Sequence, residues 1–273
     1  RLRNFGYRPN TIEDFRTWFR QILDFCVHPS RAAAPVQDQL KLVVAKHLYT
    51  LIDFRLEDSL KPFLEGNSRY EAWLRLVDIA RLKFDLNQER MGQVRRLEKM
   101  LRPETLEQKL EAYLLIQDAE CYRLPSAPGI LDDEDDYRGA ERAAERFGRE
   151  AVDHPELLER LLPRLVSEGN TLCHYFGRGI SQATEDREQM FAALIKEQAT
   201  TQPEPRSLCL LRGFIDALSR VDPRQYDRCL HAIIADPNNV AWYPDLENGT
   251  SSGFHRRAIA ALAQESCSPE FYG

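Results

Sequence analysis

Apolar residues recur along most of the chain at positions i, i+3, i+4 and i+7, the spacing that gathers them on one face of an α-helix. One such stripe runs through Trp73, Leu76, Val77, Ala80 and Leu82. Alternating apolar and polar residues, which would indicate a half-buried strand, are nearly absent. The pattern therefore predicts an all-α fold.

Further apolar stripes of the same kind lie in the N-terminal half. They comprise Phe15, Trp18, Phe19, Ile22, Leu23 and Cys26; Leu40, Val43, Val44, His47, Leu48, Leu51 and Ile52; Leu97, Met100 and Leu101; and Leu106, Leu110, Tyr113, Leu114 and Gln117. The last stripe follows Pro-Glu-Thr, a typical helix start. Pro163 lies inside a stripe of the C-terminal half and predicts a kink or a break, since an interior proline costs a helix about 3 kcal/mol.

The stretch RLPSAPGILDDEDDYRG, residues 123–139, is the clearest interruption of the helical pattern. We interpret it as an acidic loop or boundary between an N-terminal helical region, residues 1–122, and a helical-repeat region, residues 140–273. The closest calcium-loop register over these acids puts Arg138 at a ligand position, where a cation repels the metal. A solvated loop is therefore preferred to a metal site.

Two glycine-containing pairs recur in the C-terminal half. Arg-Gly begins at Arg178 and again at Arg212, 34 residues later, and Gly-Phe begins at Gly213 and again at Gly253, 40 residues later. Such spacings suit two-helix hairpins stacked on one another. A mid-helix glycine costs about 1 kcal/mol relative to alanine, so its recurrence predicts places where another helix backbone passes closely. We expect an α-solenoid or helical-hairpin repeat array of about ten to twelve helices.

These glycines do not fit a phosphate-binding loop. A P-loop needs GxxxxGK followed by Ser or Thr, and no lysine follows Gly179. A dinucleotide site needs a third glycine and a preceding strand. No HExxH zinc motif or hydrolase elbow occurs either, and we expect no catalytic residues and no cofactor. An enzyme whose site is assembled from scattered acids remains an alternative.

The segments RLLPRLVSEGNTLCHYFGRGIS, LLRGFIDALSRVDP and SSGFHRRAIAAL, within residues 153–263, resemble helical-repeat segments of the HEAT or tetratricopeptide type. Such segments lie toward the C-terminus of large bacterial multidomain proteins, including STAND-type NTPases of antiphage defence. The resemblance implies a ligand-sensing or docking array whose enzymatic parts lie outside this chain. The chain begins with Arg1 rather than Met, which also suggests a piece of a longer protein. The repeat subclass stays open.

Composition limits the partners. With 43% hydrophobic and 29% charged residues the chain should fold, and its net charge of −6 gives no general attraction to a phosphate backbone. No apolar run approaches the roughly 20 residues of a membrane-spanning helix, and the N-terminus lacks the apolar core of a secretion signal. We expect a cytoplasmic protein that does not contact membranes. The six cysteines show no CxxC spacing, so reduced, buried thiols without metal are expected.

Three arginines are the candidate partner-binding residues: Arg178, Arg212 and Arg256. If Arg178 and Arg212 occupy equivalent repeat positions, they lie on one face, where guanidinium groups can bind carboxylates of a protein partner. The alternative is that each arginine braces the neighbouring repeat. Protein recognition by a non-catalytic scaffold is therefore the leading function.

A row of basic residues on one predicted helix offers a second function, nucleic-acid binding. The row spans residues 90–102 and comprises Arg90, Arg95, Arg96, Lys99 and Arg102. Glutamates interrupt it and no aromatic residues interleave to stack on bases, which favours a solvated helix face.

Overall fold

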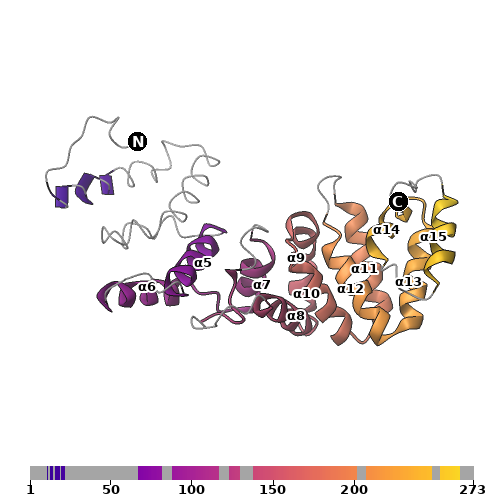
Figure 1. Ribbon diagram of the computed structural model, residues 1–273, viewed down its shortest axis with the longest axis horizontal. Helices are drawn as coiled ribbons and strands as arrows, with labels where there is room; N and C mark the ends of the chain where they lie inside the picture. The colour runs from indigo at the N-terminus through magenta and orange to yellow at the C-terminus, as the bar shows by residue number, and fades with distance from the viewer. Residues whose placement is uncertain are drawn as a thin grey trace. The chain divides into compact units, whose positions relative to one another are not determined.

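The computed structural model describes residues 67–81, 88–116, 123–129, 138–201, 207–247 and 253–264, and part of the segment 11–21. The regular structure given for these ranges is helical, which confirms the all-α prediction for them (Figure 1). The elements are α5 (Asn67–Arg81), α6 (Gln88–Leu101), α7 (Leu106–Leu114), α8 (Gly139–Ala151), α9 (Pro155–Glu168), α10 (Cys173–Ala183), α11 (Arg187–Thr200), α12 (Cys209–Val221), α13 (Pro223–Ala235), the 3-10 helix η4 (Val240–Trp242), α14 (Tyr243–Leu246) and α15 (Phe254–Leu262).

The chain divides into two compact units. Unit 1 comprises residues 1–103 and 128–134, and unit 2 comprises residues 104–127 and 135–273. The division differs from the boundary expected at 123–139, because it places α7 with the C-terminal helices. Residues 131–137, the acidic centre of that stretch, lie outside the described residues.

The turn between α9 and α10 explains why α7 belongs to unit 2. Asn170 in this turn is buried, and its side-chain amide donates hydrogen bonds to the carbonyls of Tyr113 (2.8 Å) and Ile116 (3.0 Å). Its backbone N–H donates to the carbonyl of Leu114 (2.9 Å). The last carbonyls of a helix lack partners within it, so Asn170 satisfies the end of α7 and fixes it to α9 and α10.

In unit 1, α5 packs against α6 around one buried carboxylate. Trp73 is fully buried, and its indole N–H donates to Oε1 of Glu98 at 2.9 Å. Arg102 donates to both oxygens of Glu98, at 3.0 and 2.6 Å. The guanidinium of Arg69 also donates to the carbonyl of Leu101 at 3.1 Å, which satisfies the C-terminal end of α6.

The predicted stripe on α5 is confirmed, since Trp73, Leu76, Val77 and Ala80 are buried; Leu82 lies outside the described residues. On α6 the prediction is wrong for Met100, which is 44% exposed, because it lies beyond the edge of the face that packs on α5. The two N-terminal stripes, from Phe15 to Cys26 and from Leu40 to Ile52, fall largely or wholly outside the described residues.

Side-chain caps set three helix starts in unit 2. The side chains of Thr105, Asp186 and Asp222 accept hydrogen bonds from backbone N–H groups in the first turns of α7, α11 and α13. The expected break at Pro163 does not occur. Helix α9 continues through it, and the exposed position of Pro163 keeps its ring out of the core.

The most extensive helix contacts in unit 2 join alternate helices, because α10 packs against α8 on one side and α12 on the other. A Cβ atom on Gly179 would overlap the backbone carbonyl of Glu145 in α8. A Cβ on Gly213 would likewise overlap the carbonyl of His174 in α10. In the same way, a Cβ on Gly148 of α8 would overlap the carbonyl of Phe176 in α10, and a Cβ on Gly177 of α10 would overlap the carbonyl of Leu210 in α12. The predicted close helix approach at Gly179 and Gly213 is thereby confirmed.

An aromatic ring lies beside each of these close approaches. Phe147, Phe176 and Phe214 are buried at 2% exposure or less, one on each of α8, α10 and α12. Phe147 also meets Tyr113 of α7 edge-to-face, with ring centroids 5.1 Å apart. Glycine lets the backbones meet, and phenylalanine fills the space beside the crossing.

The predicted equivalence of Gly253 with Gly213 is wrong. Gly253 precedes α15 as its N-cap with φ of 88°, in the left-handed region that only glycine adopts readily. It therefore starts a helix, whereas Gly213 lies within one and touches a neighbouring backbone.

We expect Gly179→Ala and Gly213→Ala each to destabilise unit 2 by about 3 kcal/mol, because the added methyl group meets backbone that cannot rotate away. Denaturant unfolding followed by circular dichroism measures this. Gly92→Ala on α6 is the matched control. Apart from the nearby backbone of its own helix, nothing lies within 4 Å of its Cβ position, so alanine should stabilise there by up to about 1 kcal/mol. A neutral or stabilising effect at Gly179 and Gly213 would contradict the tight contact.

Candidate functional site

A polar pocket of about 370 Å³ opens beside α10 and α12, and we call it the α10–α12 pocket. Its lining residues come from α10, α12, α13 and the end of α14: His174, Arg212, Asp216, Ser219, Tyr226, Leu246 and Glu247. Arg212, Asp216 and Ser219 follow at intervals of four and three residues, which places them on one face of α12. The contact of Gly213 with the His174 backbone brings α10 to this face.

His174 is half-buried, and its Nε2 lies 3.9 Å from Oδ2 of Asp216. Burial lowers the pKa of His174 below its usual 6.5, and the positive charges of Arg178 and Arg212 lower it further. The carboxylates of Asp216 and Glu141 act in the opposite direction without reversing the shift. The imidazole is therefore predominantly neutral at pH 7.

Ser219, His174 and Asp216 share the pocket but do not form a nucleophilic triad. The Ser219 hydroxyl donates to the backbone carbonyl of Asp216 at 2.7 Å, a bond within its own helix turn. The 3.9 Å separation of His174 and Asp216 exceeds a hydrogen bond. In this arrangement the serine proton is not directed toward a base, as nucleophile activation requires.

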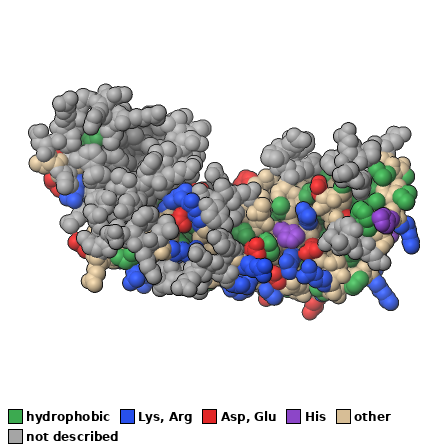
Figure 2. Space-filling model, in the orientation of Figure 1, with side chains coloured by type: hydrophobic (Ala, Val, Ile, Leu, Met, Phe, Trp, Pro, Cys, Tyr) green, Lys and Arg blue, Asp and Glu red, His purple; other side chains and the backbone are tan. Residues whose placement is uncertain are grey.

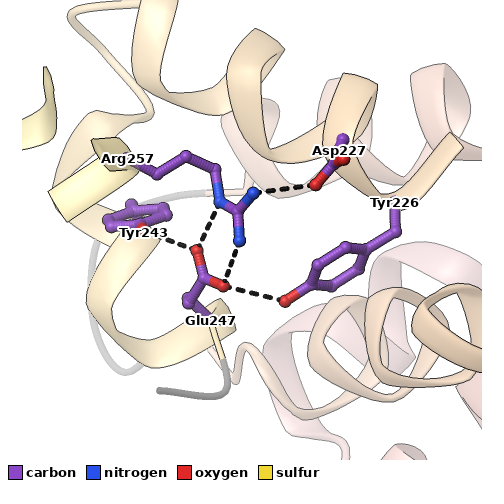
Figure 3. A network of polar contacts seen from close by, with 5 residues as sticks. All are labelled: Tyr226, Asp227, Tyr243, Glu247 and Arg257. Carbon is purple, nitrogen blue, oxygen red and sulfur yellow. Dashed lines mark hydrogen bonds and ion pairs between the residues drawn. The ribbon is translucent and has the colours of Figure 1, made fainter. Parts of the chain in front are cut away.

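A buried network forms the wall of the pocket at Glu247 (Figure 3). Arg257 of α15 donates to both oxygens of Glu247, from Nε at 2.8 Å and from Nη2 at 2.7 Å, and from Nη1 to Asp227 at 2.7 Å. The hydroxyls of Tyr226 and Tyr243 each donate to one oxygen of Glu247. Glu247 and Arg257 are only 0% and 3% exposed at their side chains.

This network is saturated. The carboxylate of Glu247 accepts four hydrogen bonds, about as many as its two oxygens can take. Hydrogen bonding to Glu247 raises the pKa of Arg257, and burial raises the pKa of Tyr243, so both groups keep their protons at neutral pH. Glu247 therefore binds α13, α14 and α15 together and is not free to act as a base.

The predicted partner-binding arginines have different surroundings. Arg178 is half-buried, with Nη2 3.7 Å from Oε2 of Glu145 on α8 and its guanidinium 5.8 Å from the ring centroid of Tyr175. Arg212 is exposed and lines the pocket, and no carboxylate among the described residues forms an ion pair with it. Arg256 is exposed on α15, away from the pocket lining. The pocket thus brings together Arg212 and His174 but neither of the other two arginines.

The basic row on α6 is interrupted structurally. Arg95, Arg96 and Lys99 are exposed, but Arg102 is engaged with the buried carboxylate of Glu98. The side chain of Arg90 lies outside the described residues. The row therefore offers fewer exposed cations than its sequence suggests.

Cys173 and Cys229 are buried cysteines, and burial raises the pKa of the Cys229 thiol to about 12, which keeps it protonated. Cys26, Cys121 and Cys267 lie outside the described ranges. Within those ranges no three His, Cys, Asp or Glu side chains converge as metal ligands.

Sequence reasoning missed most of the pocket. Asp216 and Ser219 carried a usable signal, since their spacing from Arg212 predicts one polar face on an otherwise apolar helix. Tyr226, Leu246 and Glu247 carried none, because the packing of α13 on α12 places Tyr226 and the turn through η4 and α14 places Leu246 and Glu247.

Comparison with known proteins gives no relative: no family model, curated protein or solved structure matches the chain. Among the helices that the structure describes, none combines the length and the apolar character needed to cross a membrane. On the visible face of unit 2, acidic and basic side chains intermingle without a large patch of one sign (Figure 2).

Glu247→Gln should destabilise unit 2 by about 3 kcal/mol or more, because it leaves the buried Arg257 without its bidentate carboxylate. Denaturant titration measures the loss. Asp227→Asn is the control: its side chain is 54% exposed, and we expect a change of about 1 kcal/mol or less. Equal small effects of both variants would show that the buried pair contributes little.

Protonation of His174 should weaken the fold. Because its pKa is lowered on folding, the unfolded chain binds the proton more tightly, and stability falls as pH drops below about 6.5 toward the folded pKa. We expect His174→Gln to lose less stability than the natural chain between about pH 7.5 and pH 5.5, measured by denaturant unfolding at each pH. Parallel losses in the two proteins would contradict the lowered pKa.

Proposed function

We propose that the chain is a non-catalytic helical-repeat scaffold, an α-solenoid, that recognises a protein partner through side chains of α8, α10 and α12. The observation that carries this proposal is the stacking of these three helices through glycine contacts. Helix α11, in turn, contacts α9 and α13, as expected for a second layer of alternate helices.

The uneven spacing of the two layers supports a curved surface. Backbone contacts at Gly148, Gly177, Gly179 and Gly213 draw α8, α10 and α12 closer together than contacts between whole side chains allow. A stack with one tighter layer curves toward that layer, and solenoids bind partners on their concave side. The α10–α12 pocket and Arg212 belong to the tight layer.

The charge distribution favours a protein over a nucleic acid. A nucleic-acid surface concentrates positive charge, whereas α8, α10 and α12 carry both signs, in Glu145, Arg178, Arg212 and Asp216. The alternative nucleic-acid surface on α6 has fewer available cations, because Arg102 is paired with the buried carboxylate of Glu98.

The saturated Glu247 and the internal hydrogen bond of Ser219 support a non-catalytic role. The resemblance of residues 153–263 to repeat segments of bacterial multidomain proteins supports assignment of this scaffold to the sensor part of a larger defence protein in the cytoplasm. Such a part would supply recognition, and enzymatic activity would come from other domains.

Face-specific photo-crosslinking tests the proposal. A photoreactive phenylalanine analogue replaces the half-buried Tyr175 of α10 in one variant and the exposed Lys196 of α11 in the other, so that Arg212 stays in place, and each variant is irradiated in extract of the source cells. We expect a protein captured from position 175 and not from position 196, which then binds the purified natural chain. Capture of the same proteins from both positions would contradict recognition through the tight layer, and salt-dependent capture of DNA or RNA would favour the α6 alternative.

A further inference from the structure

We propose that the α10–α12 pocket binds a carboxylate side chain from an acidic segment of the protein partner, with Arg212 as its anchor. The inference rests on the proposed function and specifies the chemistry of the partner. It starts from a cavity whose lining holds one exposed arginine without a carboxylate partner among the described residues.

Arg212 is available because the nearby carboxylates are directed elsewhere. Asp216 lies one helical turn from it, a spacing that permits an ion pair, yet the basic group found within 4.0 Å of Asp216 is the neutral imidazole of His174, at 3.9 Å, and not Arg212. Glu247 is enclosed by Arg257 and two tyrosines. A planar guanidinium left open in this way can bind an incoming carboxylate through two parallel hydrogen bonds.

Other arginines of unit 2 show the contrast. Arg178 pairs with Glu145, and Arg164 pairs with Glu111 at 2.6 Å, so each bridges two helices of the fold. Arg212 makes no such bridge to another described residue, although it lines the pocket. The charge of Arg212 is therefore available to bind a partner, whereas the charges of Arg178 and Arg164 stabilise the fold.

The rest of the lining suits a peptide. A volume of about 370 Å³ holds a side chain with part of its backbone. Leu246 and Tyr226 also line the pocket, although they are only 3% and 5% exposed. Asp216 can accept hydrogen bonds from backbone N–H groups, as can the oxygen of Ser219, whose proton is donated within its own helix.

The same lining disfavours phosphate. Asp216 lies in the pocket with Arg212, and Glu141 acts on His174 from α8, so a multiply charged anion meets repulsion from two carboxylates. A single carboxylate side chain carries less charge. The peptide that bears it also brings backbone N–H groups, which can donate hydrogen bonds to Asp216. We therefore commit to an acidic peptide segment.

His174 reports on occupancy. The charge of Arg212 helps to lower its pKa, together with burial and the charge of Arg178. A carboxylate bound to Arg212 offsets that charge, so the pKa of His174 should rise when the pocket fills. Glu141 and Asp216, the facing carboxylates, stay in place during this change.

The test is an NMR pH titration of the His174 imidazole, with an end-blocked hexaglutamate peptide as the probe and hexaglutamine as its neutral match. We expect hexaglutamate to raise the pKa of His174 and hexaglutamine to leave it unchanged. Arg212→Gln should weaken hexaglutamate binding at least about tenfold and remove the shift. The control is Arg224→Gln, which changes an exposed arginine of α13 outside the pocket lining and should bind as the natural chain does.

Absence of the pKa shift with hexaglutamate, or equal binding by Arg212→Gln, overturns the inference. A shift of equal size with inorganic phosphate at matched concentration also overturns it, because the pocket then binds anions generally. Since Arg212 is exposed, an unchanged unfolding midpoint of Arg212→Gln confirms that the fold is intact. Crosslinking of a partner at position 175 without any pKa shift of His174 leaves the proposed function standing and rejects only the acidic chemistry.

Discussion

The contact of backbone with backbone at the glycines of α8, α10 and α12 sets the architecture of unit 2. Gly179 and Gly213 leave no room for a Cβ atom, since a carbonyl of the preceding helix in the stack occupies that space. This constraint fixes the rotation of each helix, and with it the side chains that point away from the stack. Arg212, Asp216 and Ser219 on α12 lie next to His174 on α10 for this reason.

The second constraint is the buried ion pair of Glu247 and Arg257, which joins α13, α14 and α15. Breaking such a pair costs more than forming it contributes, so it specifies one arrangement of these helices rather than adding much stability. Because Glu247 and Tyr226 also line the α10–α12 pocket, the network gives the pocket a rigid wall. Binding at Arg212 would then require little reorganisation of that wall.

The sequence predicted features that depend on local periodicity. The stripe from Trp73 to Ala80 and the close approach at Gly179 and Gly213 both follow from residue types at helical spacing. Gly253 shows the limit of prediction from local pattern. The dipeptide Gly-Phe lies within α12 at Gly213 but stands at the start of α15 at Gly253.

Tertiary partners could not be predicted in the same way. Arg178 and Arg212 occupy matching sequence positions, but among the described residues Arg178 meets a carboxylate and Arg212 does not, because Glu145 lies opposite Arg178 on α8. Glu247 follows a short turn with no periodic signal, and its four hydrogen-bond donors come from α13, α14 and α15. The α10–α12 pocket is therefore a product of packing that the amino-acid pattern does not display.

Hydroxyl-radical footprinting of the chain with its captured partner tests most directly whether recognition occurs through the tight layer. The method measures side-chain exposure residue by residue, and both layers carry half-buried reactive side chains. We expect His174 and Tyr175 on α10 to lose reactivity in the complex while Met190 on α11 keeps it. Protection of Met190 with unchanged reactivity of His174 and Tyr175 would place the partner on the other layer and contradict the account.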